Sequence, residues 1–176
     1  MRSVKLAALA TTGVLVLAGC ATGNPQVAAY VGDTEITQAQ VDSVSKVLAN
    51  TSSDPTDTAG SFGTTVLQIM IQSKIAADVA EAKAITITDT QRQQVLASNA
   101  NLATLAKDPA ATDFINKYVE AVAVVGTDAG KSAFSDQFAK TAIRVNPRFG
   151  VWDDAHHALV DGSTGSISDV APIRQE

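Results

Sequence analysis

The sequence predicts a mainly α-helical domain: a bundle of about five helices with a small N-terminal β-hairpin and a short C-terminal strand. Three observations support this fold class. Apolar residues recur at helical spacing in several long segments. Two Thr-x-x-Gln sequences, at Thr37 and Thr88, have the form of a capping box, which marks a helix N-terminus. Aromatic content is only 5%, and the apolar residues are mainly Ala, Val, Leu and Ile, which favours a helical core of small side chains.

The N-terminal segment has the layout of a secretory signal peptide. Arg2 and Lys5 precede an uncharged, mostly apolar run over residues 6–17, which is too short to span a bilayer as a helix. Small residues then lead to Cys20, the only cysteine of the chain. We therefore expect residues 1–19 to be removed on export.

The Leu-Ala-Gly sequence directly before Cys20 is similar to the lipobox of bacterial lipoproteins. This resemblance implies that the Cys20 thiol receives a diacylglyceryl group and that Cys20 becomes the first mature residue. The alternative is an ordinary signal peptide with an accidental cysteine nearby. We expect a lipid-anchored protein on the extracytoplasmic face of the cell membrane, with residues 20–26 as a polar tether.

The first structured elements after this tether are a hairpin and a helix. Residues 27–36 predict two short strands joined by Gly32-Asp33, and Gly at the first turn position suits a type II′ turn. The capping box at Thr37 begins a helix whose apolar residues are Val41, Val44 and Leu48. Residues 50–60 are rich in Ser, Thr, Asp and Pro and predict a loop.

Two longer helices are expected next. Ser61 is predicted to cap a helix that runs to about Ala84, with a wide apolar face formed by Leu67, Met70, Ile71, Ile75 and Val79. Residues 85–87, Ile-Thr-Ile, are all β-branched and predict a short extended link between the two helices. The capping box at Thr88 then begins a third helix that carries Val95, Leu96, Leu102 and Leu105.

The last helices follow a break at Asp108-Pro109, where Asp108 is the predicted cap of a fourth helix. That helix ends at Gly126 and carries Phe114, Tyr118, Val122 and Val125. A fifth helix is expected from Asp128 to about Ala142. Residues 143–145 predict a strand, and residues 154–176 predict a polar tail that is poorly ordered beyond position 160.

The net negative charge of the chain argues against two kinds of binding partner, nucleic acid and anionic lipid surfaces. The chain has 13 Lys and Arg against 18 Asp and Glu, a formal net charge of −5, and loss of Arg2 and Lys5 would make it more negative. An acidic chain without a basic cluster is not expected to bind nucleic acid or an anionic lipid surface. Contact with the membrane is therefore expected through the lipid anchor only.

No catalytic constellation is visible, and we expect no enzyme activity, cofactor or metal. Asp153, Asp154, His156 and His157 are the only cluster of metal-type ligands, but adjacent histidines point in different directions. We interpret them as a solvated polar segment. There is no Gly-x-Ser-x-Gly elbow, and the Gly-Lys-Ser sequence at Gly130 lacks the upstream glycine of a phosphate loop.

The segment from Asn146 to Trp152 is the most distinctive one outside the signal peptide. It concentrates Arg148, Phe149 and Trp152, residue types that are typical of contact hot spots, so these three are candidate peptide-binding residues. The alternative is that Phe149 and Trp152 cover one end of the helical core.

The order of elements resembles the N-terminal domain of SurA- and PrsA-type extracytoplasmic chaperones. The resemblance rests on Ala-Ala-Tyr-Val-Gly-Asp-Thr-Glu-Ile-Thr, on Val-Leu-Gln-Ile-Met-Ile-Gln-Ser-Lys-Ile-Ala and on Ala-Ile-Thr-Ile-Thr-Asp-Thr-Gln. The Val-Asn-Pro-Arg-Phe-Gly-Val-Trp-Asp segment is similar to the closing segment of actinobacterial lipoproteins with this domain. The similarity covers most of residues 27–153 and implies a fold like the SurA N-terminal or trigger-factor peptide-binding domain.

This chain departs from the family pattern in three places. Val31 stands where an Asn before Gly is commoner, and Ala84 where a Gly often ends the long helix. Full members carry a parvulin-type prolyl isomerase domain, whereas too few residues follow Gly150 to form one. The resemblance thus implies a chaperone-like lipoprotein that binds unfolded or exported polypeptides without isomerase activity. A structural subunit with one dedicated envelope partner is the alternative, and a metal- or solute-binding lipoprotein is a third possibility that rests on His156 and His157.

Overall fold

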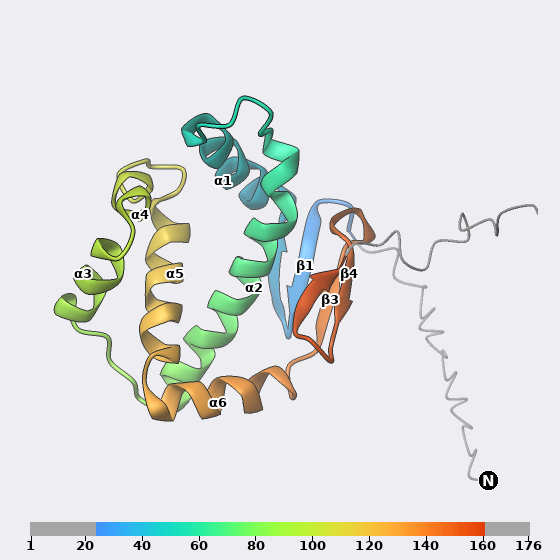
Figure 1. The fold of residues 1–176 in the computed structure, drawn as a ribbon. Helices are drawn as coiled ribbons and strands as arrows, with labels where there is room; N and C mark the ends of the chain where they lie inside the picture. The colour runs from blue at the N-terminus through green and yellow to red at the C-terminus, as the bar shows by residue number, and fades with distance from the viewer. Residues whose placement is uncertain (1–23, 161–176) are drawn as a thin grey trace, which may run out of the picture.

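A computed structural model describes residues 24–160 of the chain. Within this range the protein is mainly helical, with two small antiparallel sheets, so the predicted fold class is confirmed at this level. The long helix α2 runs through the middle of the molecule (Figure 1). The strands lie on one side of it, and α3, α4 and α5 lie on the other. No helix of this range is long and apolar enough to cross a membrane.

The predicted N-terminal hairpin is confirmed. β1 (Val27–Val31) and β2 (Thr34–Thr37) pair antiparallel around a two-residue turn in which Gly32 has a φ of +57°. Only the first turn position is left-handed, as a type II′ turn requires. The predicted strand β3 (Ile143–Val145) pairs antiparallel with β1, which gives a three-stranded sheet in the order β2-β1-β3.

Helix α1 (Gln38–Thr51) starts at the predicted capping box. The Gln40 backbone N–H donates to Thr37 Oγ1 at 3.3 Å, and the Thr37 N–H donates to Gln40 Oε1 at 2.8 Å. Helix α2 (Ala59–Ala82) starts slightly earlier than expected. Its N-cap is Thr58, and Ser61, the predicted cap, lies inside the first turn, where its hydroxyl accepts the Thr58 N–H at 3.3 Å. Ala84, just past the helix, has a left-handed φ of 51°.

The predicted third helix is two helices. α3 (Asp89–Ala97) has the expected capping box at Thr88, but α4 (Ala100–Leu105) begins anew after a break. Asn99 caps α4 by accepting the Asn101 N–H at 2.9 Å, and the Ser98 hydroxyl donates to the Val95 carbonyl at 2.7 Å. Short polar side chains compete in this way with the helical hydrogen bonds of the backbone. The molecule therefore has six α-helices in the described range, where about five were expected.

The expected start of the next helix is wrong by one turn. The Asp108 carboxylate accepts the Ala110 N–H at 2.8 Å and closes a separate turn that includes Pro109. Helix α5 (Thr112–Val125) begins after that turn and ends at Gly126, as predicted. Helix α6 (Asp128–Phe138) is shorter than the expected span to Ala142.

The fold extends beyond the expected boundary at residue 153. A 3₁₀ turn η1 (Pro147–Phe149) is followed by a second hairpin, formed by β4 (Val151–Asp153) and β5 (Ala158–Val160). Residues 154–160, which were expected to belong to the polar tail, thus form the turn and return strand of this hairpin. The prediction of poor order for residues 161–176 lies outside the described residues.

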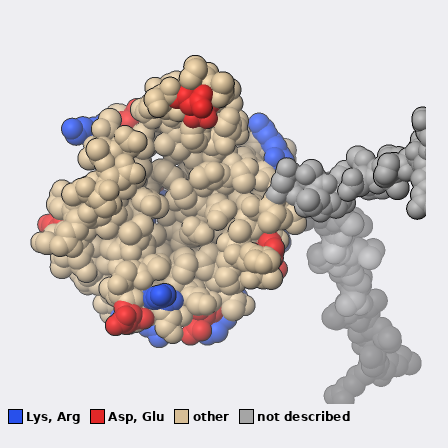
Figure 2. All heavy atoms as spheres, in the orientation of Figure 1, with Lys and Arg blue, Asp and Glu red and all other residues tan. Residues whose placement is uncertain are grey.

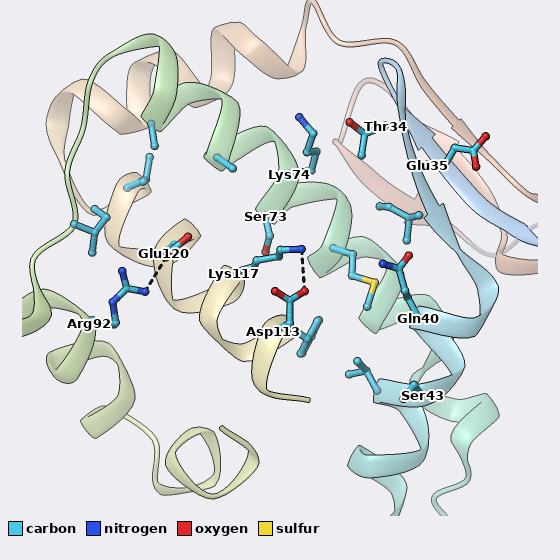
Figure 3. A pocket seen from close by; sticks show the side chains of 18 of the residues that line it. Thr34, Glu35, Gln40, Ser43, Ser73, Lys74, Arg92, Asp113, Lys117 and Glu120 are labelled. Atoms are coloured by element: carbon cyan, nitrogen blue, oxygen red, sulfur yellow. Dashed lines mark hydrogen bonds and ion pairs between the residues drawn. The ribbon is translucent and has the colours of Figure 1, made fainter. Parts of the chain in front are cut away.

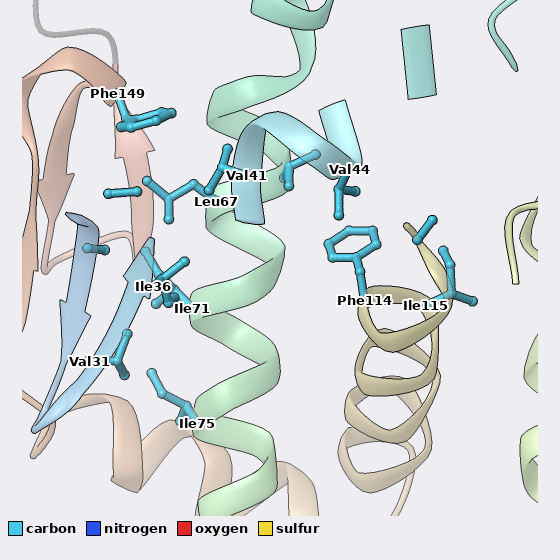
Figure 4. Close-up of a cluster of buried hydrophobic side chains, with 14 of the residues drawn as sticks. Val31, Ile36, Val41, Val44, Leu67, Ile71, Ile75, Phe114, Ile115 and Phe149 are labelled. Carbon is cyan, nitrogen blue, oxygen red and sulfur yellow. The ribbon is translucent and has the colours of Figure 1, made fainter. Parts of the chain in front are cut away.

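The hydrophobic core surrounds α2. Leu67, Ile71 and Ile75 of this helix are fully buried and face side chains from both sides (Figure 4). The sheet side contributes Val31, Ile36 and Phe149, α1 contributes Val41 and Val44, and α5 contributes Phe114 and Ile115. Because β2, α1 and α5 all pack on α2, their positions relative to one another are set by this one helix.

Candidate functional site

A cavity of about 890 Å³ lies along α2, between β2 and α1 on one side and α5 on the other (Figure 3). Its volume falls within the range of about 300–1,000 Å³ that is usual for ligand pockets. Residues 34–36 of β2 and four residues of α1 form one wall. The opposite wall comes from α5, with Arg92 of α3 beyond it. The floor is formed by residues of α2, and residues 85–87 close one end.

Helical periodicity explains why these side chains share one surface. On α2 the lining residues are Met70, Ser73, Lys74, Ala77 and Ala80, and on α5 they are Asp113, Phe114, Lys117, Glu120 and Val124. Residues three and four apart lie on the same face of a helix, so each set forms one stripe. The two stripes face the same space because α2 packs directly on α5.

Most of the cavity surface is apolar. Ile36, Val44 and Phe114 are buried at its edges, and Met70, Ile85 and Ile87 are partly exposed within it. Ala77 is exposed in the middle of the floor, where its short side chain leaves the space open. Ser73, 5% exposed, contributes a polar group at the floor. Such a lining favours uncharged, apolar groups of a ligand.

The basic side chains around the cavity are already paired. Lys117 Nζ lies 2.9 Å from Asp113 Oδ2, and Arg92 Nη1 lies 2.8 Å from Glu120 Oε1 (Figure 3). Lys74 pairs with Asp78 one turn further along α2. Glu35, in contrast, has no ion pair among the described residues, and its side chain projects from β2 on the side away from Thr34 (Figure 3). The cavity therefore offers no unpaired cation to an anionic ligand.

Charged side chains are sparse on the face of the molecule that Figure 2 shows. Lys, Arg, Asp and Glu gather at the periphery of this face, and most of the surface between them is uncharged (Figure 2).

The three candidate residues from the sequence do not lie at this cavity. Phe149 is 8% exposed and packs in the core, and Trp152 is half-buried and stacks on Phe138 with 6.0 Å between the ring centroids. Arg148 is exposed, and its Nη1 donates to Gln38 Oε1 at 2.9 Å. The structure thus favours the alternative interpretation, in which Phe149 and Trp152 cover one end of the core.

The acidic and histidine cluster lies in the turn of the second hairpin. His156 Nδ1 is 2.6 Å from Asp153 Oδ2, and both groups are accessible at the surface. The hydrogen bond from His156, together with that from the Ala155 N–H, holds the pKa of Asp153 below its ordinary value of 3.8. His157 turns away from this pair, and its ring lies 4.7 Å from that of Phe138. Within residues 24–160, no group of three potential metal ligands comes together.

Cys20 lies outside the described residues, so its lipidation stays a prediction. The cavity itself was not predicted. The local signal for it was the spacing of Asp113, Lys117 and Glu120, which places them on one face of a helix whose other positions are mostly apolar.

Comparisons with known proteins place no relative beside this chain: no protein family, no curated protein and no solved structure matches it.

Proposed function

We propose that this protein is a lipid-anchored, extracytoplasmic chaperone-like protein that binds unfolded or exported polypeptides. The observation that carries the proposal is the cavity along α2, which is open, mostly apolar and lined by paired charges. The proposal includes a finer fold identity, a SurA N-terminal-like domain, and an anchor at Cys20. These two parts are supported by the sequence patterns alone.

The physical properties of the cavity suit weak binding of many apolar segments. Burial of one Val, Leu or Phe side chain contributes about 1.5–3 kcal/mol. A cavity of this size admits several such side chains, but ordering an extended chain opposes part of this gain. About half of the lining residues are polar or charged, but the basic side chains among them are already paired with carboxylates, so the apolar surface supplies most of the binding and sequence preference is broad. Weak and broad binding is what a holding chaperone requires.

A substitution in the cavity floor tests the proposal directly. Ala77 is exposed and lies in the floor, so Ala77→Trp fills the cavity without displacing core side chains. Ala82, the last residue of the same helix, is also exposed but does not line the cavity, so Ala82→Trp is the matched control. Both variants are made in the fragment of residues 21–176, which contains every described residue.

The measurement is the aggregation of an unfolded model protein, followed by light scattering without ATP. The unmodified fragment and Ala82→Trp should slow aggregation, and Ala77→Trp should not, while all three melt at similar temperatures. Equal activity of the two Trp variants would show that the cavity is not the binding site. No effect on aggregation by any form, together with cross-linking to one envelope protein, would favour the dedicated-subunit alternative.

A further inference from the structure

Strand β2 is the outer strand of its sheet and also forms one wall of the cavity. The sheet order is β2-β1-β3, so one edge of β2 has no neighbouring strand among the described residues. Residues 34–36 of this strand line the cavity. An unpaired strand edge presents backbone N–H and C=O groups that can bind another extended chain.

The hydrogen-bond pattern identifies Glu35 as the residue whose backbone groups face outward. Gly32 N–H donates to the Ala142 carbonyl, and Asn146 N–H donates to the Ala28 carbonyl, so even-numbered residues of β1 bond towards β3. Tyr30 belongs to this set and is the cross-strand partner of Glu35. Because Tyr30 directs its backbone groups to β3, the N–H and C=O of Glu35 point away from β1.

The two faces of β2 differ in chemistry. Thr34 and Ile36 pair with Val31 and Ala29, which are buried towards α2, and Ile36 itself is 6% exposed. Glu35 is exposed on the opposite face. On that face the guanidinium of Arg144, which is on β3, lies 5.0 Å from the centroid of the Tyr30 ring, and Glu35 has no ion pair among the described residues. The Glu35 carboxylate is therefore available to a new partner.

We propose that β2 accepts an extended polypeptide segment as an added strand, with a Lys or Arg between two apolar residues. This inference rests on the proposed function. If the added strand runs antiparallel to β2, the residue opposite Glu35 exchanges two backbone hydrogen bonds with it and shares its face, so a basic side chain there forms a cross-strand ion pair. Its two neighbours would point to the other face, towards Ile36 and the cavity. Charge complementarity thus selects the basic residue, and the apolar lining selects its neighbours.

The test uses a short synthetic peptide with Leu or Val at alternate positions, Thr between them and one central Lys. Binding to the fragment of residues 21–176 is measured by fluorescence anisotropy. A second peptide carries a methyl group on the backbone nitrogen of the central Lys, which removes one of the two hydrogen bonds to Glu35. Losing a hydrogen bond of this kind should weaken binding by up to about tenfold.

Two substitutions of Glu35 test what its backbone N–H and its carboxylate each contribute to peptide binding. Glu35→Pro removes the outward N–H, and because that group makes no bond to β1, the hairpin should keep its own ladder. Glu35→Gln retains the backbone and removes only the charge. We expect Glu35→Pro to weaken binding by about tenfold, and Glu35→Gln by up to about threefold, the latter only for the peptide with central Lys and not for a central-Gln peptide.

Direct support would come from amide hydrogen exchange. The Glu35 amide should exchange more slowly when the peptide with central Lys is bound, and this measurement does not depend on any variant folding. Binding that is unaffected by N-methylation and leaves Glu35 exchange unchanged would overturn the added-strand inference but leave the cavity as a peptide site. Binding of none of the peptides, with no suppression of aggregation, would overturn the proposed function as well.

Discussion

Truncation of Phe149 to alanine should destabilise the fold and leave the cavity along α2 intact. Phe149 is 8% exposed, and its ring lies 3.5 Å from the position that a Cβ on Gly63 of α2 would take. Its carbonyl accepts a hydrogen bond from Thr64 Oγ1 at 3.3 Å. Phe149 therefore joins the C-terminal segment to the middle of the core, and it does not line the cavity.

The size of the effect follows from this burial. Removal of a buried Phe side chain costs about 3–5 kcal/mol, because both transfer free energy and packing contacts are lost. For a folded unit of this length, 1 kcal/mol changes the melting temperature by roughly 3–4 °C. Phe149→Ala should accordingly lower the melting temperature by roughly 10–20 °C.

Thermal and urea unfolding, followed by circular dichroism, measure this change. Val151→Ala is the matched control because Val151 is two residues away and 54% exposed, so its loss should change stability by no more than about 0.5 kcal/mol. At a temperature where both variants are folded, peptide binding should equal that of the unmodified protein. A small change in melting temperature with a clear loss of binding would refute this reasoning and restore Phe149 as a contact hot spot.

The remaining predictions concern four other positions. Cys20→Ser should release the protein from the membrane fraction or leave it unprocessed, and normal cleavage with unchanged membrane retention, seen by fractionation and immunoblotting, would contradict the lipid anchor. Ala84→Gly should raise the free energy of unfolding by about 0.5–1 kcal/mol in urea titrations, because residue 84 has a φ of 51°. Gly130→Ala should lower the free energy of unfolding by about 1–3 kcal/mol or more, since a Cβ there would lie 2.0 Å from the Val124 carbonyl oxygen. The pKa of Asp153 is lowered in the folded state, so its carboxylate stabilises the hairpin at neutral pH and loses this effect as the pH falls below 3.8; melting curves of Asp153→Asn should therefore differ from the unmodified protein at neutral pH and converge with it in acid.

Local signals with a strict geometric requirement could be read from the sequence. The N-terminal hairpin could be predicted because Gly32 stands at the first position of a two-residue turn, where a type II′ turn needs a left-handed residue, and its φ of +57° confirms the reason. Both Thr-x-x-Gln capping boxes form, at Thr37 and at Thr88. In each case the residues that decide the conformation are within a few positions of one another.

Errors arose where two local signals compete. Ser98 and Asn99 interrupt an apolar pattern that continues on both sides, and the pattern alone predicted one helix where the structure has α3 and α4. The Asp108 carboxylate does cap a backbone N–H, but that of a separate turn and not of α5. The second hairpin was missed because β4 and β5 are three residues each and their pairing is stabilised by contacts with α2 and β3, which are distant in sequence.

The cavity could not be predicted because its lining residues are individually ordinary. Each wall contributes positions that any amphipathic helix or half-buried strand contains. The sequence does not distinguish an alanine in the cavity floor from an alanine in the core. The open space lies where α1 and α5 both pack on α2 and the lining includes small side chains such as Ala77, which leave it unfilled. Burial is decided by this distance between helices, and no periodicity within one helix encodes it. The edge of β2 is similar: Glu35 looks like a solvent-facing strand residue, and only the sheet order, with β3 on the far side of β1, shows that its backbone groups face the cavity side without a strand partner.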